Sequence, residues 1–228
     1  MTAADTSTAM MDKLADSAWT QLAEMSPRSL HIDDIAAAAG VAPSAARAVA
    51  GSITALILHQ LARLDRQAVL QSLADIEDAG DVPIRDKIME AMMHRFEIYA
   101  PYRAQTAQLE RAARRDPALG LRLIDSLVQA TRMMLRMAGD DLTGLAGEAR
   151  VRGVAGVAMV VARVWRTDDT PDLSLTLKEI DKRLATAEEW GRTLRVLRDG
   201  VSGDAGHGAG DDHGFEGPAE EGPNGRYQ

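Results

Sequence analysis

Helical periodicity runs through almost every segment of the chain before residue 200. Ala, Leu, Arg and Glu are abundant there, whereas alternating runs of β-branched residues are scarce, and this balance favours helices over strands. Four prolines stand where the first turn of a new helix tolerates them, at positions 83, 101, 117 and 171. The sequence therefore predicts an all-α fold, with helices near residues 10–25, 31–39, 43–50, 52–78, 83–99, 101–115, 117–138, 144–166 and 172–199.

The composition bounds the class of protein. A chain of 228 residues with 46% hydrophobic residues can bury a substantial core. It contains no Cys, which excludes disulfides, thiolate metal sites and a cysteine nucleophile. The first residues lack the basic start and apolar run of a secretory signal. A bacterial cytoplasmic location is the simplest expectation.

The character of the chain changes after Gly200. Residues 201–228 are glycine-rich, acidic and nearly free of aliphatic side chains, so they bury too little surface to offset their chain entropy. We therefore predict a disordered tail over residues 200–228. His207 and His213 lie among three aspartates there, but their irregular spacing favours chance composition over a metal site.

Residues 29–57 have the pattern of a short helix, a tight turn and a second helix. Gly40 can supply the positive φ of the turn, and Pro43 suits the first turn of the second helix. One face of the first helix is apolar and comprises Ile32, Ile35, Ala36 and Ala39. The segment thus predicts a helix-turn-helix-like unit.

This unit resembles the headpiece of the TetR superfamily. The family pattern Asp-Ile-Ala-x-Ala-Ala-Gly-Val is matched from Asp34 to Val41. The following family positions are occupied differently, by Ala42, Pro43, Ala45, Arg47, Ala50 and Ile53 in place of Ser, Lys, Thr, Tyr, Phe and Lys. The resemblance implies a TetR-like fold in which scaffold residues are kept and most DNA contacts are lost.

The charge of the headpiece points the same way. Residues 1–60 hold three basic residues, Lys13, Arg28 and Arg47, against six acidic ones, a formal charge of −3. DNA affinity depends on Lys and Arg neutralising phosphates. The charge therefore argues against DNA as a partner and favours a packing module, with Ser44 and Arg47 left as the candidate DNA contacts.

Two later stretches are similar to the Coq-nine family of ubiquinone-biosynthesis accessory proteins. Residues 95–112 share its Arg-rich helix broken by a Pro-Tyr pair, and residues 164–184 share its Thr-Pro-Asp block. The matched positions are Pro101, Tyr102, Asp169, Thr170, Pro171, Asp172, Asp181, Arg183 and Leu184. The resemblance implies a lipid-binding, homodimeric, non-catalytic partner of a quinone-ring hydroxylase. Helix capping explains the second block equally well, with Thr170 as cap and Pro171 at the first position.

Soft apolar side chains mark a candidate lipid pocket. Methionine adapts to irregular apolar ligands, although core packing explains the same pattern. The helix over residues 153–165 is apolar nearly all round, which predicts a central position. The predicted pocket residues are Met92, Met93, Phe96, Tyr99, Met133, Met137, Val157 and Val160.

The last predicted helix carries an apolar stripe flanked by arginines. The stripe contains Trp190, Leu194 and Leu197, and the arginines are Arg192, Arg195 and Arg198. Trp and Arg at helical spacing are typical of a helix lying on an anionic membrane surface. Packing of the stripe onto the bundle or onto a second subunit is an equal alternative.

Enzymatic motifs are absent from the sequence. It contains no Gly-rich phosphate loop, nucleophile elbow or His-Glu-x-x-His. His31, His59 and His94 stand alone on helical faces, without metal-like spacing to another histidine. We therefore expect no catalytic residue, metal or cofactor.

These features combine into one hypothesis with an alternative. Residues 1–51 form a helix-turn-helix-like headpiece, residues 52–199 a helical ligand-binding and dimerisation domain, and residues 200–228 a tail. The function predicted is a lipid-binding accessory protein of ubiquinone biosynthesis that carries a lipid or isoprenoid quinone precursor, with peripheral attachment to the inner membrane as an option. The alternative is a ligand-responsive TetR-family transcriptional regulator that binds DNA.

Overall fold

The computed structural model describes the backbone of residues 3–79 and 82–204 and the side chains of residues 4–77 and 82–189. Two compact units are present, residues 1–187 and residues 188–228. The first unit contains all the sites described below. The predicted boundary near residue 51 coincides with the break between the third and fourth helices, and the division into domains there stays a prediction.

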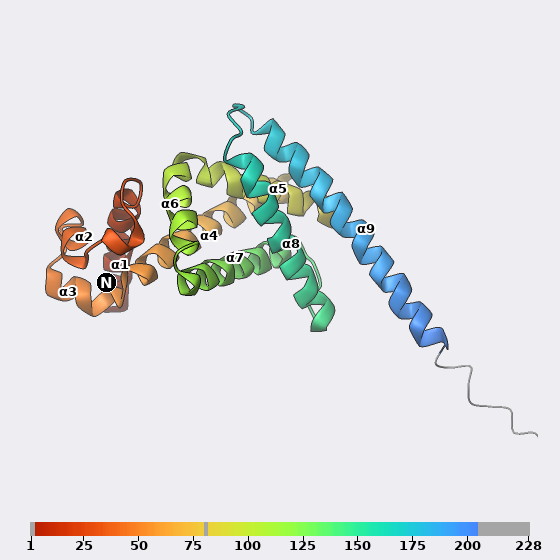
Figure 1. Ribbon diagram of the computed structural model, residues 1–228, viewed down its shortest axis with the longest axis horizontal. Helices are drawn as coiled ribbons and strands as arrows, with labels where there is room; N and C mark the ends of the chain where they lie inside the picture. Colours follow the sequence, from red (N-terminus) through yellow and green to blue (C-terminus); the bar gives the residue numbers. More distant parts are fainter. Residues whose placement is uncertain (1–2, 80–81, 205–228) are drawn as a thin grey trace, which may run out of the picture. The chain divides into compact units, whose positions relative to one another are not determined.

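The regular elements of the described residues are all helices, with no strand among them, which confirms the predicted all-α fold (Figure 1). The observed helices differ from the predicted ones in the first and the last helix. The first helix begins at Ala3 rather than 10, and the backbone of the last continues to Asp204, so residues 200–204 of the predicted disordered tail are helical. The elements are α1 Ala3–Gln21, η1 Pro27–Ser29, α2 Ile32–Ala38, α3 Pro43–Ala50, α4 Ile53–Ala79, α5 Ile84–Tyr99, η2 Ala100–Tyr102, α6 Arg103–Ala113, α7 Pro117–Met137, α8 Gly144–Trp165 and α9 Ser174–Asp204.

The headpiece consists of α1, α2 and α3 packed around one apolar centre. Leu14 of α1 and Leu22, which directly follows α1, are fully buried there together with Ile35 of α2. Gly40 has φ of 65° in the turn between α2 and α3, and Pro43 stands at the start of α3. The predicted helix-turn-helix geometry is therefore confirmed, because both residues occupy the places that their backbone preferences favour.

Helix α4 connects the headpiece to the body. It packs against α1 near its beginning and against α5 and α7 further along. Two polar contacts tie it to α1: His59 Nε2 lies 2.6 Å from Asp12 Oδ1, and Arg63 donates to Asp16 Oδ1 at 2.7 Å. The helices of the body, α4 to α8 and the start of α9, enclose a continuous apolar core.

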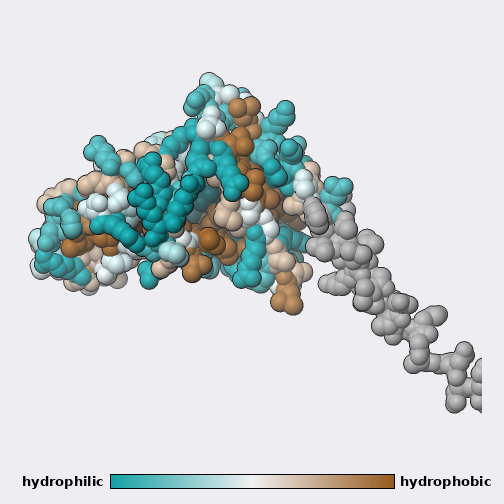
Figure 2. All heavy atoms as spheres, in the orientation of Figure 1, coloured by the Kyte–Doolittle hydropathy of each residue, from teal (hydrophilic) through white to brown (hydrophobic). Residues whose placement is uncertain are grey.

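Helix α8 is not central, contrary to the prediction from its apolar sequence. Val151 and Val161 on one face are fully buried. On the opposite face nothing lies within 4 Å of a Cβ added to Gly153 or Gly156, and Met159 is 47% exposed. Apolar atoms are visible at the lower end of α8 among hydrophilic neighbours (Figure 2). The sequence is apolar on both faces, but within one chain only one face is covered.

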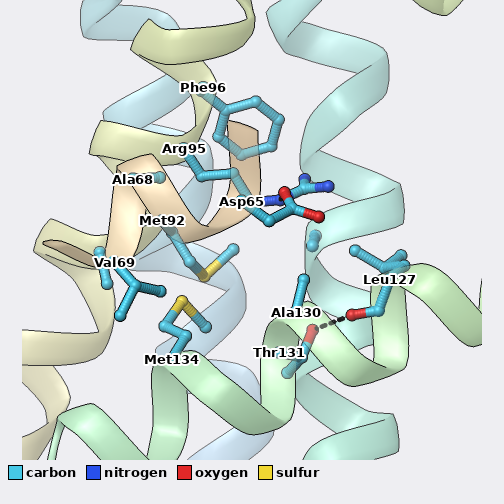
Figure 3. Close-up of a pocket in the computed structure, with 12 residues that line it drawn as sticks. Asp65, Ala68, Val69, Met92, Arg95, Phe96, Leu127, Ala130, Thr131 and Met134 are labelled. Atoms are coloured by element: carbon cyan, nitrogen blue, oxygen red, sulfur yellow. Dashed lines mark hydrogen bonds and ion pairs between the residues drawn. The ribbon is translucent and has the colours of Figure 1, made fainter. Parts of the chain in front are cut away.

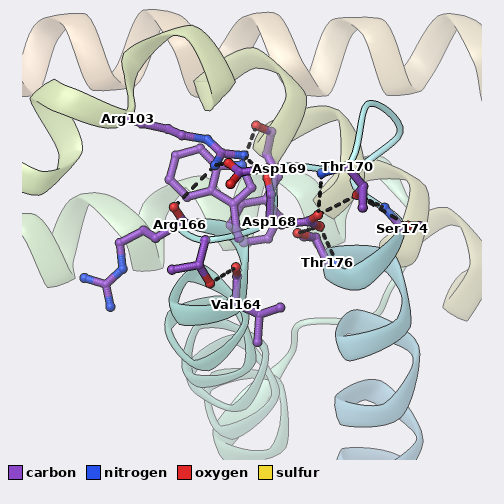
Figure 4. A network of polar contacts seen from close by, with 11 residues as sticks. Arg103, Val164, Arg166, Asp168, Asp169, Thr170, Ser174 and Thr176 are labelled. Carbon is purple, nitrogen blue, oxygen red and sulfur yellow. Dashed lines mark hydrogen bonds and ion pairs between the residues drawn. The ribbon is translucent and has the colours of Figure 1, made fainter.

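The turn between α8 and α9 is built on a buried carboxylate, Asp168 (Figure 4). Its two oxygens accept hydrogen bonds from the backbone amides and hydroxyls of Thr170 and Thr176. Burial raises the pKa of Asp168, but these hydrogen bonds outweigh it and lower the pKa to about 2. Because α9 begins at Ser174, the predicted helix start with Pro171 in the first turn is wrong.

Candidate functional site

A small cavity lies inside the body between α4, α5, α7 and α8 (Figure 3). Its volume is about 20 Å³, which is room for about one water molecule. Most of its wall is apolar, but α4 and α5 each contribute one charged side chain. The lining residues are Asp65, Ala68, Val69, Ala91, Met92, Arg95, Phe96, Leu127, Ala130, Thr131, Met134 and Ala158.

The two charged residues of this wall form an ion pair. Arg95 Nε donates to Asp65 Oδ1 at 2.7 Å, and the Tyr99 hydroxyl lies 3.1 Å from the same oxygen and 3.3 Å from the carbonyl oxygen of Leu61. The Arg95 guanidinium also lies 4.8 Å from the centre of the Tyr99 ring. One carboxylate oxygen of α4 therefore anchors the side chains of Arg95 and Tyr99 on α5.

The surroundings of Arg95 and Tyr99 determine which of the two side chains is charged. Burial lowers the pKa of Arg95, but the Asp65 carboxylate and the Tyr99 hydroxyl raise it, and the net value lies above the ordinary one. Burial, followed by the Asp65 carboxylate, raises the pKa of Tyr99 well above its ordinary value. At neutral pH the Arg95 guanidinium in the cavity wall is therefore charged, and the adjoining Tyr99 phenol is neutral.

The guanidinium retains unused donors. Among the described residues, Arg95 donates through Nε to Asp65, and its guanidinium also interacts with the Tyr99 hydroxyl, which leaves some of its five N–H donors unused. Planar guanidinium donors match the oxygens of a carboxylate or a similar acceptor. Met92 and Met134 supply adaptable apolar walls nearby. The site thus has the chemistry to hold a largely apolar molecule with one oxygen acceptor.

The headpiece presents α3 on its surface. Ser44, Arg47 and Ala48 are exposed on this helix. The Arg47 guanidinium lies 2.6 Å from Asp33 Oδ1 of α2, and the two side chains are 57% and 59% exposed. The candidate DNA contact Arg47 is therefore neutralised by a neighbour in the unbound chain.

Two solved structures are similar to this one along most of their length. One is a TetR transcriptional regulator from Nitrosomonas europaea ATCC 19718, with a TM-score of 0.61 and 15% identity over 78% of this chain and 98% of that chain. The other is a TetR-family transcriptional regulator from Streptomyces coelicolor, with a TM-score of 0.57 and 19% identity over 86% of this chain and 90% of that chain. The fold is TetR-like.

Comparison of the sequence alone is less informative than comparison of the structure. No protein-family model and no curated protein matches the sequence. The similarity to the Coq-nine family therefore rests on residues 95–112 and 164–184 alone. One of these stretches has a structural explanation in the TetR-like body, because Asp168, Thr170 and Thr176 hold the turn before α9 together.

The cavity of the TetR-like body brings together two of the eight predicted pocket residues, Met92 and Phe96. Tyr99 adjoins it through Asp65. The remaining five do not line it: Met93 and Val157 are buried in the core, and Met133, Met137 and Val160 are half-buried.

Asp65 and Arg95 were missed by the sequence reasoning. A signal existed, because Asp65 shares a helical face with the buried Leu61 and Ala68, and Arg95 shares one with the buried Ala91 and Tyr99. An acidic residue on one apolar face and a basic residue on another indicate a buried ion pair.

The predicted membrane-facing residues lie outside the described side chains; these are Trp190, Arg192, Leu194, Arg195, Leu197 and Arg198. Within the described part of the chain no single helix is long and apolar enough to cross a membrane. Helix α3 and the part of α4 up to Glu77 would be so together, but they meet at a bend of 69°. His207 and His213 also lie outside the described residues.

Proposed function

We propose that the protein is a non-enzymatic, ligand-responsive regulator of the TetR type, in which α3 contacts DNA and the body binds a small molecule. The observation that carries this proposal is the combination of an exposed α3 after a tight turn with a charged cavity in the body of the same chain. The fold shared with two TetR-type regulators supports it.

The acidic headpiece is compatible with DNA binding if Arg47 changes partners. Its ion pair with Asp33 is more than half exposed on both sides, and such pairs contribute at most about 1 kcal/mol. Exchange of the Asp33 carboxylate for a DNA phosphate or a guanine edge therefore costs little. Few phosphates would be contacted in total, since the first 60 residues hold three basic side chains.

The ligand would enter between α4, α5, α7 and α8. Since the cavity has a volume of about 20 Å³, any ligand larger than water requires these helices to separate. The terminal nitrogens of Arg95 are the donors that would orient an oxygen acceptor. Ligand binding would then move α4, which is the helix that contacts the headpiece.

A homodimer is the assembly that we expect. The outward face of α8 has glycines with open space around them and the half-exposed Met159, and such a face allows a second helix to approach closely. In a dimer the apolar sequence of α8 would be buried on both sides.

A lipid-binding role in ubiquinone biosynthesis is less well supported. A cavity of about 20 Å³ has no room for an acyl or isoprenoid chain. The quinone-ring hydroxylase partner rests on the resemblance alone, and the helix suggested for membrane contact lies beyond the described side chains. Mass spectrometry of organic extracts from gently purified protein tests this role, and an isoprenoid enriched on the protein would support lipid binding.

DNA binding can be tested by selecting genomic fragments on the protein at about 50 mM salt and measuring their affinity. Two substitutions of neighbouring exposed aspartates separate the roles of charge and of Arg47. Asp33→Asn and Asp34→Asn each remove one negative charge, but only Asp33→Asn releases the Arg47 guanidinium. We expect Asp33→Asn to strengthen binding several-fold more than Asp34→Asn does.

Arg47→Ala should abolish binding to the selected fragment, whereas Arg28→Ala, with the same loss of charge at η1, should weaken it less. Contacts through Arg47 alone in a homodimer predict a slope of log K against log salt of about −2. Failure to retain any genomic fragment at low salt would refute the proposal, as would equal effects of the two arginine variants.

A further inference from the structure

A second polar cluster joins α4 and α5 at the end of the body away from the headpiece contacts. His94 Nε2 lies 2.7 Å from Asp75 Oδ2 and 3.2 Å from Glu90 Oε1. Asp75 belongs to α4, while Glu90 and His94 are one helical turn apart on α5. One nitrogen and two carboxylate oxygens thus come within 4.8 Å of one another.

The histidine nitrogen at the centre of this cluster is not satisfied by a hydrogen bond. His94 Nε2 is buried, and within the structure described it has no hydrogen-bond partner despite the two nearby carboxylates. The side chain of His94 is 15% exposed, whereas those of Asp75 and Glu90 are 58% and 50% exposed. Two exposed carboxylates therefore face one buried nitrogen, and a buried polar atom of this kind needs a partner.

The other ring nitrogen also lies near a carboxylate. Glu97 Oε2 lies 3.4 Å from His94 Nδ1. Metal-binding histidines commonly direct their second N–H at a carboxylate, which orients the ring and makes the binding nitrogen more basic. With the proton on Nδ1, the lone pair of Nε2 points into the cluster.

From this geometry we infer that Asp75, Glu90 and His94 bind a divalent transition-metal ion of the Zn²⁺ class. An imidazole nitrogen suits Zn²⁺, Co²⁺ or Ni²⁺, whereas Mg²⁺ and Ca²⁺ prefer oxygen ligands alone. Tetrahedral ligands at Zn²⁺ stand about 3.3 Å apart, so small rotations of the exposed carboxylates complete the site. Water would take the fourth position.

The consequence of such a site is a clamp between α4 and α5. The two helices are consecutive, and each contributes at least one ligand. A bound ion would fix the distal part of α4 against α5. This site is independent of DNA binding and of the cavity ligand, so either proposal can fail without the other.

The test is a metal titration of the untagged full-length protein after dialysis against EDTA. Each variant and the reference protein carry His207→Asn and His213→Asn, which removes the histidines of the tail. Calorimetry with Zn²⁺ should give one ion per chain, Co²⁺ should produce visible d–d absorption, and Zn²⁺ but not Mg²⁺ should raise the melting temperature.

Variants assign the ligands. We expect His94→Gln and Asp75→Asn to abolish the Co²⁺ absorption, and Glu97→Gln to weaken Zn²⁺ binding about tenfold or more. His59→Gln is the matched control, because His59 also pairs with an aspartate, at 2.6 Å, and should leave metal binding unchanged. Asp75 is exposed, so its variant tests the site even where His94→Gln disturbs folding.

Absence of stoichiometric Zn²⁺ binding to the reference protein would overturn the inference. Binding that persists undiminished in both Asp75→Asn and His94→Gln would overturn it as well, since the ion would then be held elsewhere.

Discussion

The ion pair in the cavity wall gives the sharpest test of how the body is held together. Replacement of Asp65 by Ala leaves the Arg95 guanidinium in a mostly buried place without its anion. The Tyr99 hydroxyl is not orphaned, because the carbonyl oxygen of Leu61 lies 3.3 Å away. The cost of the substitution is therefore mainly that of an uncompensated guanidinium.

Breaking a buried ion pair by removing one partner costs about 3 to 5 kcal/mol. The side chain of Arg95 is 24% exposed, so water relieves part of this penalty and we expect about 3 kcal/mol. Asp65→Asn keeps Oδ1, which accepts from both Arg95 and Tyr99. It should cost about 2 kcal/mol, since the Arg95 guanidinium keeps an acceptor but loses its counter-charge, and the hydrogen bond from Tyr99 becomes a neutral one. The double variant Asp65→Leu/Arg95→Met should come within about 1 kcal/mol of the native protein.

Urea unfolding followed by circular dichroism at 222 nm measures these free energies, with protein concentration held fixed because a dimer makes stability concentration-dependent. The order of the three variants is the essential outcome. A loss of stability below about 1 kcal/mol for Asp65→Ala would contradict the reasoning. So would a double variant Asp65→Leu/Arg95→Met whose loss of stability equals the sum of the losses of Asp65→Leu and Arg95→Met measured singly.

Three further predictions concern other parts of the body. The pKa of Asp168 is about 2 in the folded chain, below its ordinary value of 3.8. The ionised carboxylate therefore stabilises the folded protein fully above about pH 4, and this contribution is lost as the pH falls towards 2. In urea unfolding at a series of acid pH values, the difference in stability between the native protein and Asp168→Asn should shrink over that range. Gly147→Ala places a Cβ 2.2 Å from the backbone of Leu142 and should cost about 1 to 3 kcal/mol of stability. Gly153→Ala has open space around it and should stabilise helix α8 of the monomer by about 0.5 to 1 kcal/mol. Similar melting temperatures for the two variants would be inconsistent with this packing. Met159→Glu should convert the expected dimer to monomer in sedimentation velocity, and Leu70→Glu, which also changes an exposed apolar side chain, should not.

The helices were predictable because their signals are local. Pro117 and the glycine-containing turn near 139–144 bound a helix within a few residues of its predicted ends. The start of α9 was not predictable in the same way. Thr170-Pro171-Asp172 has the pattern of a helix start, but the buried Asp168 carboxylate binds both Thr170 and Thr176, and the helix begins three residues later than Pro171. A tertiary contact outweighed the local preference.

The sites were harder to predict because each joins residues that are distant in sequence. Asp65 and Arg95 are 30 positions apart, and their pairing requires knowing that α4 and α5 are antiparallel neighbours. The same is true of Asp75 and His94, of which the sequence marks only His94, as a histidine that stands alone on a helical face. Periodicity identifies a face of a helix, but it does not identify the helix that covers this face.

Helix α4 connects all three sites, and this limits how a signal can pass through the protein. Arg63 contacts α1, Asp65 lines the cavity, and Asp75 belongs to the metal cluster. Arg63 and Asp75 are about 18 Å apart along the helix, and a regular helix over this length moves as one body. Of its attachments, the pair between Arg63 and the half-exposed Asp16 is weaker than the buried pair between Asp65 and Arg95. If the proposed ligand separates α4 from α5, we therefore expect the contact with α1 to loosen as well, so that the orientation of the headpiece changes while the rest of the body stays folded.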